Sequence, residues 1–314
     1  MLPDDAAPGR RLDPAQKALL CLVLALARLL RLLGYRGLAL LARLTGFCFW
    51  RLGGKRRRFA VASIERHLGV DKREARRIAR LSFNSNFLSF LEILLAPSFS
   101  IYGNPRLDYP SAFGELAVSK DRPILAVTCH LGAWELMAGM LGQFRPEYPS
   151  LVAGRNQRSD LLTVFIHRLR STGNSASVGH RNIAGLVSRT LRDKGTVAFV
   201  VDHNSSRDES IFLPFLGEIA SVNIGPAMLA LRSKAVVMPI FLKRLAPGRY
   251  ELMLLDCLDT ATLTGNIRER TARIAEFYTR AAETFVRQTP EQWFWMHNRW
   301  KTKPAGWKTR PPEG

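Results

Sequence analysis

The first fifty residues carry apolar side chains at helical spacing. One unbroken apolar stretch runs from Ala18 to Ala27, and a second runs from Leu38 to Trp50 with Arg43 inside it. Each is shorter than the roughly 18 to 20 uncharged residues of a transmembrane helix. The pattern predicts a helical anchor that lies shallow or tilted in a membrane, with its arginine side chains reaching the headgroups. A buried helix pair of a soluble protein is the alternative.

A basic cluster, Lys55-Arg-Arg-Arg58, follows the second apolar stretch. Basic residues beside an apolar segment mark the cytoplasmic side of a membrane and attract anionic lipid. A signal peptide is not expected, because Arg28, Arg31 and Arg36 stand where a cleavage site would be. We therefore divide the chain into a membrane-anchoring segment, residues 1–58, and one globular domain, residues 59–314.

The pattern changes along the globular domain. Residues 59–95 read as helices, with Asp71 as a helix N-cap, and residues 97–110 are loop-like. From Pro123 onward, short apolar runs alternate with helical ones, which is typical of βα units and predicts an α/β fold with a mostly parallel central sheet flanked by helices. Strands are predicted at 123–128, 149–153, 195–201 and 235–242, and helices near 133–142, 159–171, 181–193, 224–232 and 267–288.

Polar side chains follow the first three predicted strands. His130 comes after the first, Arg155 and Asn156 after the second, and Asp202 and His203 after the third. Because ligands of open α/β sheets bind outside the carboxyl ends of the strands, we expect these side chains to line one crevice.

His130 and Glu135 form an H-x4-E element between an apolar run and a helical apolar pattern. Histidine is suited to take a proton from a hydroxyl near neutral pH, and a carboxylate on its other nitrogen would fix its tautomer. The spacing alone is weak, because about 0.5 matches to H-x4-[DE] are expected by chance. A second match, His203 to Asp208, lacks a following helix pattern. The residues leave two interpretations of His130, a base for acyl transfer or a buried histidine that caps the next helix.

Composition and missing motifs limit the kinds of binding partner that the chain is expected to have. The chain has 46 lysines and arginines against 26 acidic residues, a net charge of +20, so it should meet an anionic surface. A membrane is favoured over nucleic acid, because no zinc-finger, helix-turn-helix or RNA-binding pattern is present. The four cysteines are far apart without a C-x-x-C pair, so no metal site is expected. Serine hydrolase, P-loop, dinucleotide-binding and zinc protease motifs are missing as well, and no cofactor is implied.

Six segments occur in order along nearly the whole chain. They are His130-Leu-Gly-Ala-Trp-Glu135, Arg155-Asn156, Gly195 to Asp202, Phe212 to Gly217, Gly225 to Ala230, and the Trp-rich Pro290 to Lys301. In this order they resemble the bacterial late acyltransferases of lipid A biosynthesis, the lauroyl and myristoyl acyltransferases within the lysophospholipid acyltransferase superfamily. The H-x4-E element is superfamily-wide, whereas the closing segment is more specific to this branch.

This resemblance implies a glycerolipid acyltransferase-like fold and transfer of a fatty acyl group from acyl carrier protein to a hydroxyl of a lipid A precursor. The enzyme would work at the cytoplasmic face of the inner membrane without an acyl-enzyme, because the donor is already a thioester. His130 would be the base and Glu135 its orienting acid.

The resemblance also implies substrate-binding residues. Arg155 would hold a phosphate or the developing oxyanion, and Asp202 would position Arg155 or the acceptor. Free backbone N–H groups near Gly132, at the start of the next helix, would serve the oxyanion. Arg168 and Arg170 would bind acceptor phosphates, with a solvated helix face as the alternative.

The tryptophans of the closing segment have two interpretations. Trp293, Trp295 and Trp300 would lie at the lipid interface, or they would pack in the core.

Two other functions remain open at this stage. The first is an acyl-CoA-dependent acyltransferase for phosphatidylinositol mannosides or another glycolipid or lysophospholipid, which shares H-x4-[DE]. The second is a basic membrane-surface or nucleic-acid-binding protein without activity, in which replacing His130 would change nothing.

Overall fold

Four helices precede the sheet in this computed structural model, which describes residues 12–118, 121–154, 156–179 and 182–307. They are α1 (Pro14–Arg31), α2 (Gly34–Leu52), α3 (Gly54–Leu68) and α4 (Lys72–Glu92), and a 3-10 turn, η1 (Ile93–Ser98), ends this region. Asp71 accepts the backbone N–H of Glu74 and caps α4, as predicted. The expected boundary at residue 58 lies within α3, so the basic cluster is the first turn of a helix that packs on α4.

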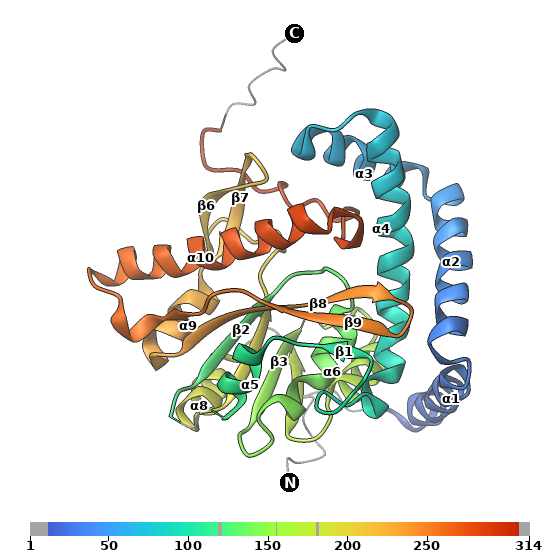
Figure 1. Ribbon diagram of the computed structural model, residues 1–314, viewed down its shortest axis with the longest axis horizontal. Coiled ribbons are helices and arrows are strands. Elements are labelled where there is room, and N and C mark those ends of the chain that lie inside the picture. Colours follow the sequence, from blue (N-terminus) through green and yellow to red (C-terminus); the bar gives the residue numbers. More distant parts are fainter. Residues whose placement is uncertain (1–11, 119–120, 155, 180–181, 308–314) are drawn as a thin grey trace.

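A mostly parallel sheet forms the centre of the molecule (Figure 1). Its strands are β1 (Leu107–Asp108), β2 (Ile124–Thr128), β3 (Ser150–Gly154), β4 (Ser175–Gly179), β5 (Thr196–Val200), β8 (Val236–Ala246), β9 (Arg249–Leu254) and β10 (Leu258–Asp259). The order is β1-β9-β8-β2-β5-β3-β4, with β10 on β8. Strands β8, β2, β5, β3 and β4 run parallel to one another, and β9 and β10 run antiparallel to β8. The predicted mostly parallel α/β fold is confirmed.

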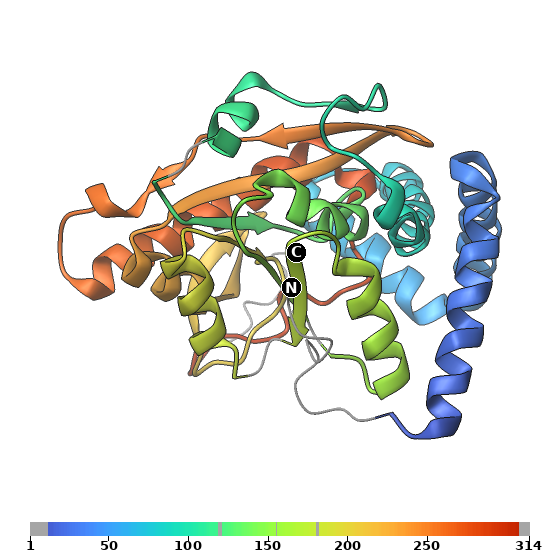
Figure 2. The same cartoon turned by 90° about the horizontal axis from the view of Figure 1, so that it is seen from below.

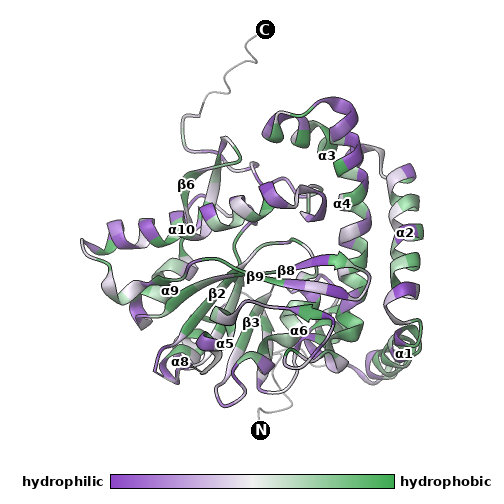
Figure 3. Ribbon diagram, in the orientation of Figure 1, coloured by the Kyte–Doolittle hydropathy of each residue, from purple (hydrophilic) through white to green (hydrophobic). Residues whose placement is uncertain are grey.

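Helices cover both faces of this sheet because both faces are apolar. The helices are α5 (Ser111–Val118), α6 (Trp134–Phe144), α7 (Asp160–Arg170), α8 (Ala184–Arg192), α9 (Gly225–Ser233) and α10 (Ile267–Gln288). Leu125 and Val127 of β2 face a core shared with α8, α9 and α10, whereas Ile124 and Ala126 face a core shared with α6 and η1. Burial on both sides is what near-continuous apolar strands require, and Figure 3 shows the central strands as hydrophobic ribbons.

Several elements were not predicted from the sequence: α5, β1, β9 and β10, together with the hairpin and the strand described next. The hairpin of β6 (Ser210–Phe215) and β7 (Glu218–Asn223) turns at Leu216 and Gly217, both with positive φ. Pro214 inside the run obscures the strand pattern, but the strand has only one partner, so its ladder tolerates the missing N–H. Strand β4 was missed because its alternating serines lack a continuous apolar run.

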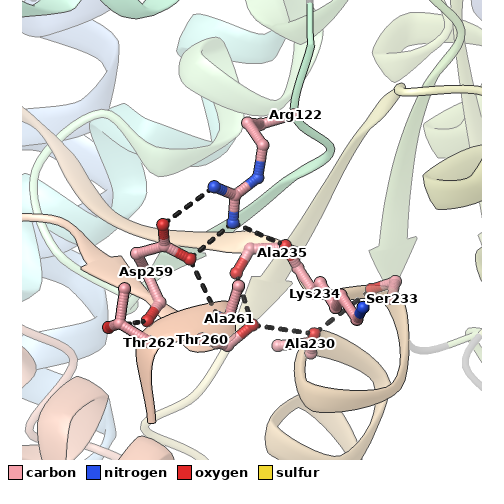
Figure 4. A network of polar contacts seen from close by, with 9 residues as sticks. All are labelled: Arg122, Ala230, Ser233, Lys234, Ala235, Asp259, Thr260, Ala261 and Thr262. Atoms are coloured by element: carbon pink, nitrogen blue, oxygen red, sulfur yellow. Dashed lines mark hydrogen bonds and ion pairs between the residues drawn. The ribbon is translucent and has the colours of Figure 1, made fainter.

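A polar network holds the amino edge of the sheet, away from the carboxyl ends of the strands. The Arg122 guanidinium donates to the Asp259 carboxylate at 2.8 Å and to the Lys234 carbonyl at 2.9 Å (Figure 4). Thr260 Oγ1 then donates to the Ala235 carbonyl at 2.8 Å. These contacts tie the loop before β2 to the ends of α9 and β10.

Helices α1 and α2 lie at the rim of the molecule, and α1 runs along its side next to α7 (Figure 2). In the described part of the chain no helix alone has the length and hydropathy to cross a membrane; α1 and α2 meet these criteria only as a pair, bent by 110° at their junction. The N-terminal helical membrane anchor predicted over residues 1–58 is therefore not supported by any single described helix. Both helices leave apolar side chains exposed, namely Leu19, Leu22, Leu26, Leu29, Leu40, Leu44, Phe47, Phe49 and Leu52.

Candidate active site

Sheet register brings His130 and Asp202 together. Thr128, the last residue of β2, is directly opposite Val200, the last residue of β5. His130 and Asp202 each follow two residues later, so they leave the sheet side by side at its carboxyl edge. This is the position at which open α/β sheets bind their ligands.

The two side chains form a hydrogen-bonded dyad. His130 Nδ1 lies 2.9 Å from Asp202 Oδ1, and the backbone N–H of His130 donates to Asp202 Oδ2 at 3.0 Å. The indole N–H of Trp293 donates to the same Oδ2 at 2.7 Å. A carboxylate partner requires the proton on Nδ1, which leaves Nε2 as the basic nitrogen. His130 does not cap α6, whose N-cap is Ala133 without a side-chain bond.

The environment shifts both pKa values. Burial of Asp202 works to raise its pKa, but the charge of His130 and the hydrogen bonds from His130 and Trp293 outweigh burial, so its pKa lies well below the usual range. Burial also works to lower the pKa of His130, and there the charge and hydrogen bond of Asp202 prevail, so its pKa lies above the ordinary value. The Asp202 side chain is 3% exposed and that of His130 is 31% exposed, so only the histidine can meet a substrate.

The carboxylate of Glu135, expected on the ring nitrogen of His130, is engaged elsewhere. Glu135 lies in the first turn of α6, and its two oxygens accept from Arg170 Nε at 2.8 Å and Nη2 at 2.7 Å. The helix turns this side chain toward α7, whereas Asp202 arrives from the neighbouring strand and takes the position on His130. Glu135 still acts on His130 through space, since its charge adds to the raised pKa.

The turn between His130 and α6 is tightly held. Gly132 has φ +64°, and a Cβ there would lie 2.1 Å from the carbonyl oxygen of Leu242. The N–H of Gly132 donates to the Gln292 carbonyl at 3.2 Å, and the N–H of Ala133 donates to Leu242 at 2.8 Å. The expectation of a free amide at Gly132 is therefore corrected, because the closing segment of the chain occupies it.

A cavity of about 740 Å³ opens beside His130. Its floor is the face of the sheet where Ala126 lies opposite both Ala198 and Met238. Two adjacent alanines leave room above the sheet that larger side chains would fill. Apolar walls come from Ile101, Phe113, Met140, Leu141, Phe144, Ile240 and Leu252. Polar residues that line the cavity include Glu135, His203, Asn204, Asn223 and His297.

Comparison with known proteins identifies the family to which the chain belongs. The model of the family "Bacterial lipid A biosynthesis acyltransferase" matches residues 9–302. The chain belongs to this family. It is 30% identical to the lipid A biosynthesis lauroyltransferase of Escherichia coli (strain K12) over 199 residues, which is 61% of this chain and 60% of that protein.

Two further lipid A relatives are more distant. The palmitoleoyltransferase of Escherichia coli (strain K12) and an acyltransferase of Shigella flexneri named for lipid A biosynthesis are each 26% identical over 193 residues, 60% of either chain. The aligned segments thus span about 60% of the length of these relatives.

The other residues expected to bind substrate in this lipid A family member differ in position. Arg170 lines the cavity but is held by Glu135, and Arg168 is exposed on α7. Arg155 lies outside the described residues. In the part of the chain that the structure describes, no group of three or more histidine, cysteine or acidic side chains could hold a metal ion.

Sequence reasoning missed Asn204 and His297, which line the same cavity as His130. The N–H of Asn204 donates to His297 Nε2 at 3.0 Å, and burial lowers the pKa of His297 to about 4. Trp293, Trp295 and Trp300 are buried, so core packing is the correct interpretation of these tryptophans. The Trp-rich segment was noticed, but nothing in the sequence indicates that Trp293 contacts Asp202, 91 residues away.

Proposed function

We propose that this protein is an O-acyltransferase that moves a fatty acyl group from a thioester donor, acyl carrier protein, to a hydroxyl of a lipid A precursor. The observation that carries the proposal is the His130–Asp202 dyad at the mouth of an apolar cavity. Family membership supports the acceptor class. The dyad argues against a binding protein without activity, since a packing histidine needs no buried carboxylate.

The chemistry follows from the dyad. His130 Nε2 takes the proton of the acceptor hydroxyl while the oxygen attacks the thioester carbonyl, forming a C–O bond and an oxyanion. Asp202 stabilises the imidazolium that results, as the carboxylate does in serine hydrolase triads. The oxyanion then collapses, the C–S bond breaks, and the thiolate takes the proton from His130. No acyl-enzyme is required.

The apolar cavity is proposed to hold the acyl chain. Each methylene moved from water into an apolar site contributes about 0.8 kcal/mol, so a fatty chain supplies much of the donor affinity. The Glu135–Arg170 pair forms part of the cavity wall, and within it the charge of Glu135 raises the pKa of His130 whereas that of Arg170 lowers it. Arg155 is proposed to hold a phosphate or the oxyanion.

Membrane contact is proposed through α1 and α2. Their exposed leucines and phenylalanines form an apolar surface suited to lie in the interface plane rather than to cross the bilayer. The expected location is the cytoplasmic face of the inner membrane, where a carrier-protein donor is available.

A donor-and-acceptor assay tests the proposal. Purified protein is incubated with acyl carrier protein or coenzyme A thioesters of defined chain length, and with either a lipid A precursor or a phosphatidylinositol mannoside, and products are identified by mass spectrometry. We expect acylated lipid A precursor from the carrier-protein donor. Transfer only from coenzyme A to the mannoside would replace the proposal by the acyl-CoA-dependent alternative.

A further inference from the structure

A second cavity, unrelated to the dyad, lies between the end of α2, the start of α3 and the first half of α4. It measures about 690 Å³ and is lined by Trp50, Leu81, Asn84 and five arginines. Those arginines are Arg57, Arg73, Arg76, Arg77 and Arg80. We call this cavity the arginine groove.

The groove exists because α2 is shorter than the face of α4 on which it packs. Gly46 of α2 lies so close to Asn84 of α4 that a Cβ would meet the amide oxygen at 2.4 Å. Asn84 belongs to a stripe of side chains on one face of α4, and toward the start of the helix this stripe continues at Arg80 and Arg73, at helical spacing. Helix α2 ends at Leu52 before it covers them, and α3 packs on a different face of α4. The stripe is therefore left open.

The groove is built from positive charge with little compensation. Arg57 is fixed, because its guanidinium lies 5.6 Å from the centre of the Trp50 ring and donates to the Trp50 carbonyl at 2.9 Å. Glu74 neutralises Arg77 through two bonds of 2.7 Å. Among the described residues, no carboxylate forms an ion pair with the remaining three, Arg73, Arg76 and Arg80, which are exposed on one helix face.

We propose that the arginine groove binds the phosphate of an anionic membrane phospholipid. Guanidinium groups match phosphate oxygens in paired hydrogen bonds. Apolar side chains adjoin the charge: Leu81 is part of the lining, and Leu52, two residues beyond Trp50, is 86% exposed. Exposed leucine beside arginine is the composition of a surface at the headgroup boundary, and it argues for a lipid rather than a protein partner.

This inference rests on the proposed membrane contact of α1 and α2 and adds a headgroup preference to it. The groove lies on α4 in the half away from Phe90, the residue of α4 that lines the catalytic cavity. A lipid phosphate bound there would orient the enzyme on the membrane without occupying the acceptor site.

Vesicle sedimentation with the full chain tests the proposal. The variant carries Arg73→Gln, Arg76→Gln and Arg80→Gln, and binding is measured to phosphatidylglycerol and to phosphatidylcholine vesicles. Each basic residue near an anionic surface contributes roughly a factor of five in affinity, so we expect a loss of about 100-fold on phosphatidylglycerol. Binding to phosphatidylcholine, which depends on the apolar surface, should change less than about twofold and shows that the variant is folded.

A matched control removes the same charge elsewhere. The control carries Arg189→Gln, Arg192→Gln and Arg232→Gln, which replace exposed arginines of α8 and α9. Its binding to phosphatidylglycerol should fall less than about fivefold, because charges far from the bound surface are screened. An equal loss in the control would mean that net charge alone attracts the protein, and would overturn the groove. The proposal would also be overturned if the groove variant bound phosphatidylglycerol as tightly as the wild type, or if the wild type bound phosphatidylglycerol no better than phosphatidylcholine. None of these readings needs acyl transfer, so a failure of the proposed activity is seen separately.

Discussion

Replacing Asp202 by asparagine removes the charge that holds His130 while nearly keeping the shape of the side chain. Asp202 accepts three hydrogen bonds, from the ring and the backbone of His130 and from Trp293. An asparagine amide oxygen cannot replace both carboxylate oxygens, and its NH2 group would face a donor or force the other histidine tautomer.

The expected loss follows from these contacts. The equivalent exchange in a serine protease triad costs about 10⁴ in kcat, and we expect a loss of about 10³ to 10⁴ here, which corresponds to roughly 4 to 5.5 kcal/mol of transition-state stabilisation.

The variant should also change the pH profile. In the wild type Asp202 raises the pKa of His130 against the effect of burial. The base is active when neutral, so kcat/KM falls as the pH drops through this raised pKa. Without the charge of Asp202 the pKa of His130 falls, and the acidic limb of the residual activity should move to lower pH.

Steady-state transfer rates between pH 5 and pH 9, followed by mass spectrometry, provide the assay. Asp259→Asn is the matched control, because it removes a carboxylate that binds Arg122 at the opposite edge of the sheet (Figure 4). It should leave the pH profile unchanged. An Asp202→Asn enzyme with more than about a tenth of the wild-type rate and an unshifted acidic limb would refute the dyad.

Four further outcomes are expected. Glu135→Gln leaves Arg170 buried without its partner and should lower the free energy of unfolding by about 3 kcal/mol in urea titration. The control Glu276→Gln breaks an exposed ion pair and should lower the free energy of unfolding by less than about 1 kcal/mol. Equal effects of the two variants would contradict the assignment of a stabilising buried pair. Gly132→Ala places a side chain at a positive φ and against the Leu242 carbonyl, so it should lower the free energy of unfolding by at least about 2 kcal/mol. An unchanged melting temperature would contradict this description of the turn. Ala198→Leu fills the cavity floor and should shift the preferred donor to a shorter acyl chain, by about fourfold in kcat/KM per methylene; an unaltered chain-length profile would place the acyl chain elsewhere. Arg155→Lys keeps the charge but loses the planar fork and should cost roughly 1 to 3 kcal/mol of transition-state stabilisation; unchanged rates on all acceptors would remove Arg155 from the site.

Part of the candidate active site was predictable because strand ends are local features. Apolar runs of five or six residues placed His130 and Asp202 at strand ends, and parallel strands bring such ends to one edge. The family pattern then selected a base over a packing histidine.

The partner of His130 was not predictable by the same reasoning. Whether Glu135 or Asp202 reaches the ring depends on the register of β2 with β5 and on the rotation of α6, and neither is visible in residue spacing. The spacing of H-x4-E drew attention to the carboxylate nearest in sequence, whereas the tertiary structure supplied one 72 residues away. The hydrogen bond of the Gly132 N–H was unpredictable for the same reason, because its acceptor, the Gln292 carbonyl, comes from the closing segment of the chain.

The central claim is that His130 is the base for acyl transfer to a lipid hydroxyl, and the rate of the His130→Ala variant tests it most directly. Wild type and variant are compared in single-turnover reactions with acyl carrier protein thioester and a lipid A precursor, and the ester product is quantified by mass spectrometry. We predict that the variant binds the donor normally and forms product at least about 10³-fold more slowly. Product formation at the wild-type rate would contradict the account.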